Sequence, residues 1–257
     1  MKRLFCLWTT LLLSLLLALP AFGAGVRLRD AIEALERPFR ADTPAGETIR
    51  DFEGEFFQES RIASLEQMQR GRGRVTVRFD RYNTRDVPTT LFRWEYSQPN
   101  NQEIVSDGRT MWVYLPENRQ VIQSDIELTR QAGQEDPMTF LTGLGNLSRD
   151  FLITWAEPNR DVEGNWVLKL RPRRVSSLIR EMNLVVDKDA VNEWINHKRT
   201  GTLFPILSSY VTDPNGNTTL IEFSDLRVNR GVSDLTFRFM VPAGVEVVRP
   251  TGQGMGY

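Results

Sequence analysis

Apolar and polar residues alternate along several stretches of the chain. Val75, Val77 and Phe79 are separated by polar side chains, so that every second residue is apolar. The same alternation recurs at residues 92–96, 166–170, 182–186 and 235–241. Successive side chains of a strand point to opposite faces of its sheet, so a period of two produces one apolar and one polar face. The pattern predicts antiparallel strands that are wetted on one face.

Short turn signals separate the strands. Asp107-Gly108 joins the apolar residues 104–106 to residues 111–114, and this dipeptide is typical of two-residue hairpins because their turn needs a positive φ. Asn215-Gly216 is a second signal of this kind, and Pro116–Asn118 is a further short turn. Strands joined by short turns form a meander rather than βαβ units. We therefore predict a mainly β (α+β) fold with about eleven strands.

One stretch near the start has helical spacing instead. Leu28, Ile32 and Leu35, together with Ala31, fall on one face of a helix. The helix is expected to end before Pro38, because the residue that precedes a proline is disfavoured in the α conformation.

A second, short apolar helix is expected to begin at Asp136-Pro137 and to include Phe140, Leu141 and Leu144. An acidic N-cap followed by proline at the first helical position is a typical start signal. Such a helix suits two roles, and the residues leave both open. It either closes over a cavity as a lid that opens, or fills the open end of the sheet as a plug.

The first 24 residues have the order of a secretory signal peptide. Lys2 and Arg3 are followed by an apolar run at residues 11–19 and by small residues at 20–24. A membrane-spanning helix needs about 20 apolar residues, and this run is shorter. We expect cleavage near Gly23 or Ala24, which leaves residues 25–257 as a single exported, soluble domain.

Composition excludes several classes of chemistry. Cys6 lies within the leader and precedes the apolar run, so residues 25–257 hold no cysteine for disulfides, thiol catalysis or cysteine metal sites. The chain has 32 Lys and Arg against 33 Asp and Glu; removing Lys2 and Arg3 with the leader leaves 30 against 33. This slight acidic excess argues against a nucleic-acid-binding protein. A hydrophobic fraction of 40% argues against wholesale disorder.

Catalytic and metal-binding signals are also missing. His197 is the only histidine, which excludes a histidine-based metal site, and a Ser-His-Asp triad would have to use it. Its neighbourhood, residues 194–198, is interpreted as the edge of a strand or turn. The sequence has no GxSxG motif and no P-loop. A carboxylate pair leaves no sequence spacing and stays open. We predict a protein without cofactor or metal that is not an enzyme.

Several of these segments closely resemble the outer-membrane lipoprotein carrier (LolA) family. The most specific part is residues 91–121, with the aromatic strand Leu91–Tyr96, Pro99 and the hairpin at residues 104–114. Phe56-Phe57-Gln58 is similar to the first strand of the family, residues 237–245 to its closing strand, and residues 137–141 to its lid helix.

The resemblance implies a half-open antiparallel β-barrel covered by an N-terminal helix and a short lid helix. The barrel would enclose an apolar cavity for the acyl chains of lipoproteins. The residues that map onto this cavity are Phe92 and Trp94 on the strand and Met138, Phe140 and Leu141 on the lid; Leu28, Ile32 and Leu35 match the first helix by pattern only. The implied protein is a monomeric periplasmic shuttle. An inner-membrane ABC-type lipoprotein-release transporter loads it with lipid-modified lipoproteins, and an outer-membrane receptor lipoprotein unloads it.

The sequence departs from the family in one place. Many members have an Arg-Pro pair just before the aromatic strand, and that arginine holds the lid closed. Here residues 82–88 look like an insertion, and no arginine directly precedes Pro88, although Arg85 is near.

Two other functions stay open beside that of a lipoprotein carrier. One is a divergent periplasmic lipid carrier or a lipoprotein sensor of the same fold, and the other is a hydrolase.

Overall fold

The computed structural model describes residues 25–80, 89–126 and 137–249 of the 257-residue chain. The predicted leader with Cys6 lies outside these ranges. So do Asp136 and residues 82–88 with Arg85, the segment that the sequence suggests to be an insertion.

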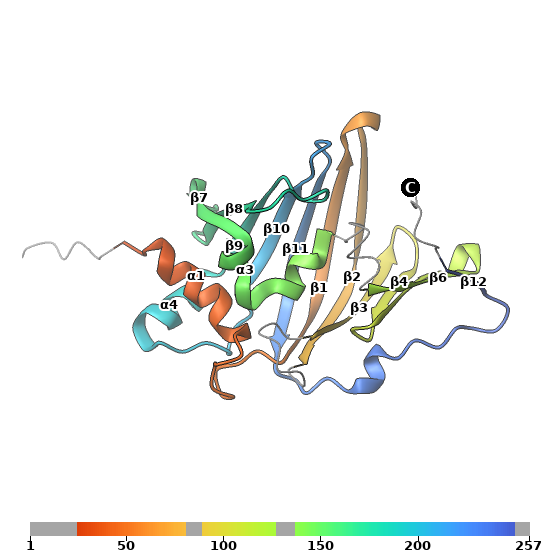
Figure 1. Cartoon of the computed structure of the whole chain (residues 1–257), viewed down its shortest axis with the longest axis horizontal. Helices are drawn as coiled ribbons and strands as arrows, with labels where there is room; N and C mark the ends of the chain where they lie inside the picture. Colours follow the sequence, from red (N-terminus) through yellow and green to blue (C-terminus); the bar gives the residue numbers. More distant parts are fainter. Residues whose placement is uncertain (1–24, 81–88, 127–136, 250–257) are drawn as a thin grey trace, which may run out of the picture.

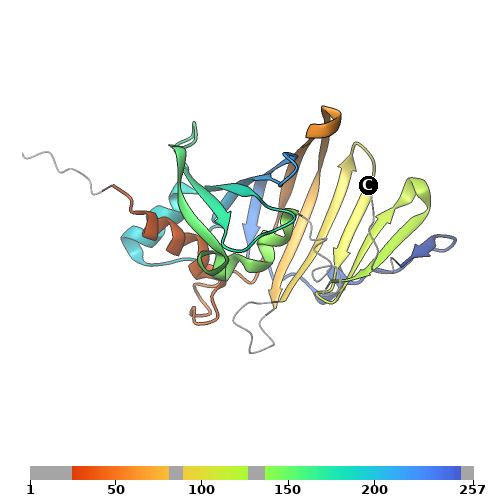
Figure 2. The same ribbon diagram turned by 45° about the horizontal axis from the view of Figure 1, so that its top comes forward.

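A twelve-stranded sheet forms the body of the molecule (Figures 1 and 2). Its order is β12-β6-β5-β4-β3-β2-β1-β11-β10-β9-β8-β7. Neighbouring strands run antiparallel except for β12 and β6, which are parallel. The strands are Asp51–Ile62 (β1), Gln67–Asp80 (β2), Thr89–Gln98 (β3), Gln102–Ser106 (β4), Thr110–Leu115 (β5), Gln120–Asp125 (β6), Phe151–Arg160 (β7), Trp166–Pro172 (β8), Glu181–Val186 (β9), Ile206–Thr212 (β10), Thr218–Val228 (β11) and Glu246–Val248 (β12).

The mainly β architecture is confirmed, with twelve strands in place of the expected eleven or so. The terminal strands of the order, β12 and β7, do not pair with each other in the described part of the chain, so the sheet is open and not closed into a barrel. The hairpin predicted at Asp107-Gly108 joins β4 to β5, and Gly108 has the required positive φ of 85°. Gly216 has the same φ in the turn between β10 and β11.

The prediction of a strand at residues 235–241 is wrong. Asp234–Phe237 form a 3-10 helix (η5), and the Ser233 hydroxyl caps it by accepting the N–H of Leu235 at 3.2 Å. A local side-chain bond of this kind competes with sheet pairing. Phe237 is 1% exposed whereas Met240 is 86% exposed. The segment therefore contacts the rest of the protein through the isolated Phe237 side chain and not through a row of alternate residues, as a strand would. The strands that the sequence pattern missed are β7 and β12.

In the part of the chain that the structure describes, the α-helices are α1 (Leu28–Glu36), α3 (Leu147–Asp150) and α4 (Lys188–His197), and the 3-10 helices before β7 are η1 (Arg37–Phe39), η2 (Ala63–Leu65), η3 (Pro116–Asn118) and η4 (Pro137–Asn146). The helix predicted before Pro38 is confirmed as α1. The helix predicted at Pro137 is present as η4, although its hydrogen bonds are of the 3-10 type. No described helix is long and apolar enough to cross a membrane.

Helix α4 corrects the interpretation of residues 194–198 as a strand or turn edge. Asp187 caps its first turn, accepting the N–H of Asp189 at 2.7 Å. Val191 is fully buried, which gives the helix an apolar anchor on the sheet. His197 is its last residue and lies 3.3 Å from the Glu193 carboxylate on an exposed face.

Alternation gives the sheet two distinct faces. The inner face is defined here by the buried residues Val75, Val77, Phe79 and Trp94, which belong to one hydrophobic core with Leu35 of α1. The outer face carries the residues between them, such as Arg78 and Arg93. In Figures 1 and 2 helices α1, α3 and α4 gather at the end of the sheet that holds β7 to β11, away from β4, β6 and β12.

Candidate functional site

The inner face of β2 to β6 is mostly apolar. The register places Val75 of β2, Trp94 of β3, Ile104 of β4, Val113 of β5 and Ile122 of β6 in one row across the strands. Trp94 is only 1% exposed, while Val113 is half-buried. A second row runs from Val77 through Phe92 to Ser106 and Met111, and there Phe92 and Met111 are half-buried. This side of the sheet is therefore apolar and incompletely covered.

Aromatic side chains form the wall at the middle of the sheet. The Phe56 ring lies between Trp94 and Tyr96, with centroid distances of 4.7 and 4.8 Å and edge-to-face geometry. The Tyr96 hydroxyl donates a hydrogen bond to Gln58 Oε1 at 2.7 Å, which fixes its ring. A Cβ at Gly71 would lie 3.1 Å from that ring, so glycine gives it room. The wall is rigid because each ring is held from two sides.

The other half of the inner face is closed. Leu168, Leu170, Leu184 and Ile206 of β8 to β10 are fully buried. Leu35 of α1 is buried in the same core. Close packing of this kind leaves little room for a ligand. The open part of the inner face is thus confined to the β3 to β6 side.

The sequence-predicted site residues that the structure describes come together in this one core. Trp94, Leu35 and Leu141 are buried members of it, and Leu28, Ile32 and Phe92 are half-buried residues packed against it. The side chains of Met138 and Phe140 lie outside the described part of the chain. Of these six, Phe92, Leu28 and Ile32 keep the most exposed surface, whereas Leu35 and Trp94 are at most 1% exposed. Their role in ligand binding stays a prediction.

Segment η4 lies close to the end of α1. Leu144 and Leu147, at the end of η4 and the start of α3, are 2% and 1% exposed. A Cβ at Gly145 would lie 2.9 Å from the carbonyl oxygen of Phe39 in η1, so only glycine permits this approach. Phe39 in turn contacts Phe79 of β2 at 4.9 Å between ring centroids. Helix α1, η1 and η4 thus form one cover that rests on the sheet.

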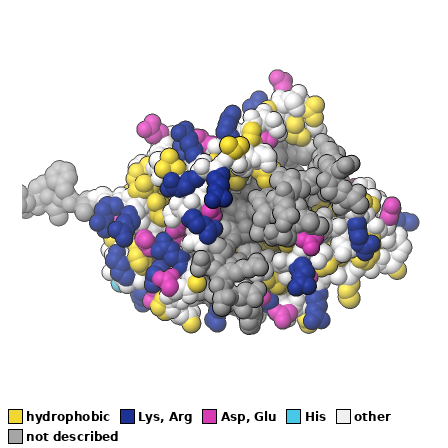
Figure 3. All heavy atoms as spheres, in the orientation of Figure 1, with side chains coloured by type: hydrophobic (Ala, Val, Ile, Leu, Met, Phe, Trp, Pro, Cys, Tyr) yellow, Lys and Arg dark blue, Asp and Glu magenta, His cyan; other side chains and the backbone are white. Residues whose placement is uncertain are grey.

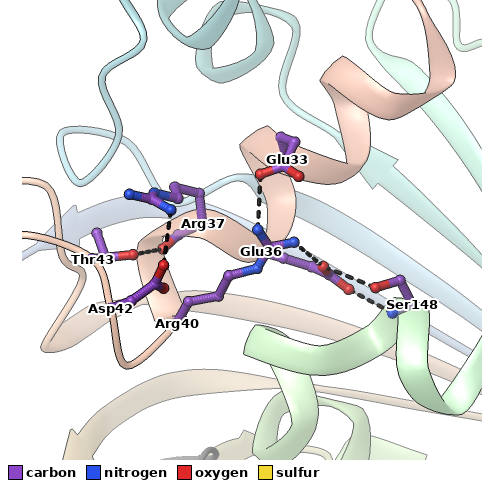
Figure 4. Close-up of polar contacts among 7 residues, drawn as sticks. All are labelled: Glu33, Glu36, Arg37, Arg40, Asp42, Thr43 and Ser148. Carbon is purple, nitrogen blue, oxygen red and sulfur yellow. Dashed lines mark hydrogen bonds and ion pairs between the residues drawn. The ribbon is translucent and has the colours of Figure 1, made fainter.

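A polar clamp, formed by Glu36, Arg40, Glu33 and Ser148, joins the end of α1 to the residues that follow η4 (Figure 4). Glu36, the last residue of α1, is 1% exposed, and its carboxylate accepts hydrogen bonds from the backbone N–H and hydroxyl of Ser148. Arg40 donates to Glu36 at 2.6 Å and to Glu33 at 2.9 Å. A buried carboxylate needs such partners, because an unpaired charge away from water is costly. The clamp therefore fixes the α3 end of the segment.

Electrostatics within the clamp favour the charged state of Arg40. Burial acts to lower the pKa of its guanidinium, but the hydrogen bonds and charges of Glu36 and Glu33 together outweigh burial and raise that pKa. The clamp was not predictable from the sequence, because Glu36 and Ser148 are far apart along the chain and no periodicity connects them. Figure 3 shows basic side chains gathered at this end of the molecule, interspersed with acidic ones.

A groove of about 1150 Å³ lies against strands β1 to β3 and β9 to β11 and the turn between β7 and β8. Its charged lining includes Glu55, Arg72, Arg74 and Glu222, whose side chains register places on the outer face. Apolar side chains such as Phe57, Val185 and Leu207 also line it, so this groove is mixed in character, unlike the row of apolar residues on the inner face. Among the described residues, no group of three or more His, Cys, Asp or Glu could hold a metal ion.

Comparison with known proteins bears on the same stretch of chain. Residues 47–240 match the family described as "Outer membrane lipoprotein carrier protein LolA". An outer-membrane lipoprotein carrier protein from Pseudomonas aeruginosa is 28% identical over 160 residues, which are 62% of this chain and 66% of the relative. One from Chromobacterium violaceum is 29% identical over 157 residues, 61% of this chain and 66% of that protein.

The chain thus spans slightly less than two thirds of the length of these relatives. Among solved structures, an uncharacterised conserved protein from Thermus thermophilus is 16% identical with a TM-score of 0.46, covering 86% of this chain and 98% of that one. A LolA superfamily protein from Nitrosomonas europaea is 13% identical with a TM-score of 0.38, covering 82% and 97%.

Proposed function

Because this chain belongs to the outer-membrane lipoprotein carrier (LolA) family, we propose that it is a periplasmic carrier that holds the acyl chains of lipoproteins on its inner face. It shuttles them from the inner to the outer membrane and performs no catalysis. One observation carries the proposal: Phe92, Met111 and Val113, neighbours on the inner face of β3 to β5, pack against the core and are only partly buried. Contiguous apolar residues that keep exposed surface are one mark of a ligand-binding surface.

The energetics of transfer define what this carrier has to do. Removing an acyl chain from water gains about 0.8 kcal/mol per methylene. In the donor membrane the chain is already out of water, so moving it onto the inner face gains nothing from the hydrophobic effect. Loading therefore requires an outside energy source, and the sequence has no P-loop to supply it. An inner-membrane ABC-type transporter as loading partner and an outer-membrane receptor lipoprotein as acceptor fit this requirement.

The form of η4 supports a cover that opens. It is a ten-residue 3-10 helix, whereas runs longer than three or four residues are uncommon because their hydrogen bonds are poorer than those of an α-helix. Its glycines, Gly143 and Gly145, weaken helix formation further. A weakly held segment that is clamped at Ser148 suits a lid with one fixed end. The Glu36 clamp would thereby take the part of the Arg-Pro lock that this sequence lacks.

The test is the identity and position of the bound ligand. Protein purified from the periplasm is analysed by native mass spectrometry, and acylated lipoprotein is the expected ligand. Bound phospholipid alone would instead favour a general lipid carrier. Displacement of an environment-sensitive apolar dye then locates the site.

Two variants make the dye experiment specific. Phe92→Glu puts a charge on the half-buried inner face and should abolish dye and lipopeptide binding. Tyr210→Glu is the matched control, because Tyr210 is 42% exposed and its register places it on the outer face of β10. Equal binding by both variants would contradict a site on the inner face.

A further inference from the structure

An unused hydroxyl lies at one end of the apolar inner face. Thr90, the second residue of β3, is 6% exposed, and its Oγ1 has no hydrogen-bond partner. Thr90 pairs with Phe79 and precedes Phe92 by two residues, so its side chain is on the inner face. Buried hydroxyls are nearly always hydrogen-bonded, and an exception requires an explanation.

A second hydroxyl lies near it. Ser106 is opposite Phe92 on β4 and is fully buried. Its Oγ accepts the N–H of Gly108 at 3.0 Å, and in the described part of the chain its own O–H donates to no acceptor. Two hydroxyl donors therefore flank the half-buried Phe92 ring at the end of β3 where the strand begins. A hydrocarbon tail makes no use of them, whereas a carbonyl oxygen accepts from them.

The opposite end of the strand offers a different environment. Tyr96 is six residues along β3, about 20 Å from Thr90 in an extended strand. Its hydroxyl is committed to Gln58, and the residues between, Phe92 and Trp94, are apolar on this face. Both ends of the inner face therefore carry hydroxyls, but the Tyr96 hydroxyl is committed to Gln58, whereas the Thr90 hydroxyl has no partner.

From this asymmetry we infer that Thr90, assisted by Ser106, donates a hydrogen bond to the carbonyl that links an acyl chain to its lipid headgroup. The linkage then lies at the start of β3, and the acyl tail runs over the partly exposed Phe92 ring in the direction of Tyr96. This inference rests on the proposed carrier function and specifies the direction in which the ligand is held. It predicts that the protein distinguishes ester-linked from ether-linked chains of equal length.

The experiment compares two synthetic probes on the full exported chain. One is a short peptide with an S-diacylglyceryl cysteine, and the other is the same peptide with dialkyl ether linkages. The wild-type protein is expected to bind the ester probe about three- to tenfold more tightly, the effect of one neutral hydrogen bond. Thr90→Val, which replaces the hydroxyl by a methyl group, should bind both probes equally. Thr90→Ser should keep the preference.

A matched control distinguishes this role from a general effect of buried hydroxyls. Ser209 of β10 is also fully buried with an unpartnered Oγ, but its pairing partners Leu184 and Ile221 lie in the closed half of the sheet. Ser209→Ala should leave the ester preference unchanged. Urea unfolding should show Thr90→Val to be at least as stable as the wild type.

Two results would overturn the inference. An ester preference that persists in Thr90→Val would show that another group makes the contact, while the carrier function would stand. Failure of the wild-type protein to bind either probe would instead contradict the carrier function itself and this inference with it.

Discussion

Glu36, at the end of α1, accepts hydrogen bonds from both the backbone N–H and the hydroxyl of Ser148, a residue 112 positions further along the chain. The pair connects the first helix to the end of η4, two segments that approach each other over the inner face. Arg40 provides a positive charge beside the buried carboxylate, since it donates to Glu36 at 2.6 Å. The cover of the inner face is therefore fixed at one point by a buried charged group.

Loss of this charge should destabilise the protein. Glu36→Gln removes the more buried of the two carboxylate partners of Arg40 and leaves Glu33, and breaking a fully buried pair costs about 3–5 kcal/mol. Arg40 is 27% exposed and can rehydrate in part. We therefore expect a loss of about 1–3 kcal/mol in the free energy of unfolding, measured in urea. Glu33→Gln, which leaves the Ser148 bonds in place, is the control and should cost clearly less.

Two leucines separate a lid from a plug. Leu147 adjoins the clamped Ser148, whereas Leu141 lies six residues nearer the start of η4, and both are buried. If the free end of η4 opens, Leu147→Ala should cost about 2–4 kcal/mol while Leu141→Ala costs about 1 kcal/mol or less. Urea unfolding of the two variants provides the comparison. Equal and large losses would identify η4 as a plug.

Asp30 should make stability depend on pH at the acid end. The hydrogen bond from Arg27, at 2.8 Å, is the main reason that the pKa of Asp30 lies below its ordinary value; burial opposes this, and the charge of Arg27 adds to it. A carboxylate with a lowered folded-state pKa stabilises the protein above its unfolded pKa, and this contribution is lost as pH falls through the folded pKa. Asp30→Asn should therefore be less stable than the wild type at pH 7.

The difference between Asp30→Asn and the wild type should shrink as the pH is lowered below 3.8, the ordinary pKa of an aspartate. Urea unfolding midpoints of both proteins across this range measure it. A constant difference at all pH values would mean that Asp30 acts through packing, not through its charge.

Asp51 anchors the chain where it leaves the sheet after β11. Its carboxylate accepts the N–H groups of Arg230 and Gly231 at 2.6 and 3.1 Å, and it is 4% exposed. Asp51→Ala leaves two N–H groups without an acceptor and should cost about 2–3 kcal/mol by urea unfolding. Asp51→Asn, which keeps one acceptor oxygen, should recover part of this. If neither variant changes stability, the segment after β11 does not need this anchor.

Processing of the leader is tested by sequencing the exported protein. Its N-terminus is expected near Ala24 or Gly25, because the small residues at 20–24 follow the apolar run. A protein that keeps Met1 and stays tightly bound to membranes would contradict this prediction.

Local patterns predicted the sheet well where one face is buried. At residues 75–79 and 92–96 the alternation corresponds to real burial, since Val75, Val77 and Trp94 are all nearly inaccessible. At residues 235–241 the same alternation misled, because the Ser233 cap produces a 3-10 turn. Helix α4 had usable signals that were missed: Asp187 is an N-cap residue, and Val191, Trp194 and Ile195 have helical spacing.

The candidate site was predictable only in part. That Phe92, Trp94 and Leu141 belong to one core was predictable, because strand parity and helix spacing are local properties of the sequence. The Glu36–Ser148 clamp and the unpaired Thr90 hydroxyl are products of tertiary packing. Local patterns in a single sequence do not show which distant groups meet, so these features required the structure.

The short strand β12 affects the tendency of the protein to aggregate. Residues Glu246, Val247 and Val248 pair with Gln120, Val121 and Ile122 of β6, and they occupy backbone groups that would otherwise be open to a neighbouring molecule. Unpaired edges of this kind are templates for aggregation, and short, charged edge strands suppress it. At the far end of the sheet, β7 contains Pro158, which has no N–H to offer. A chain with a wide, open sheet thus protects both of its margins against self-assembly into fibres.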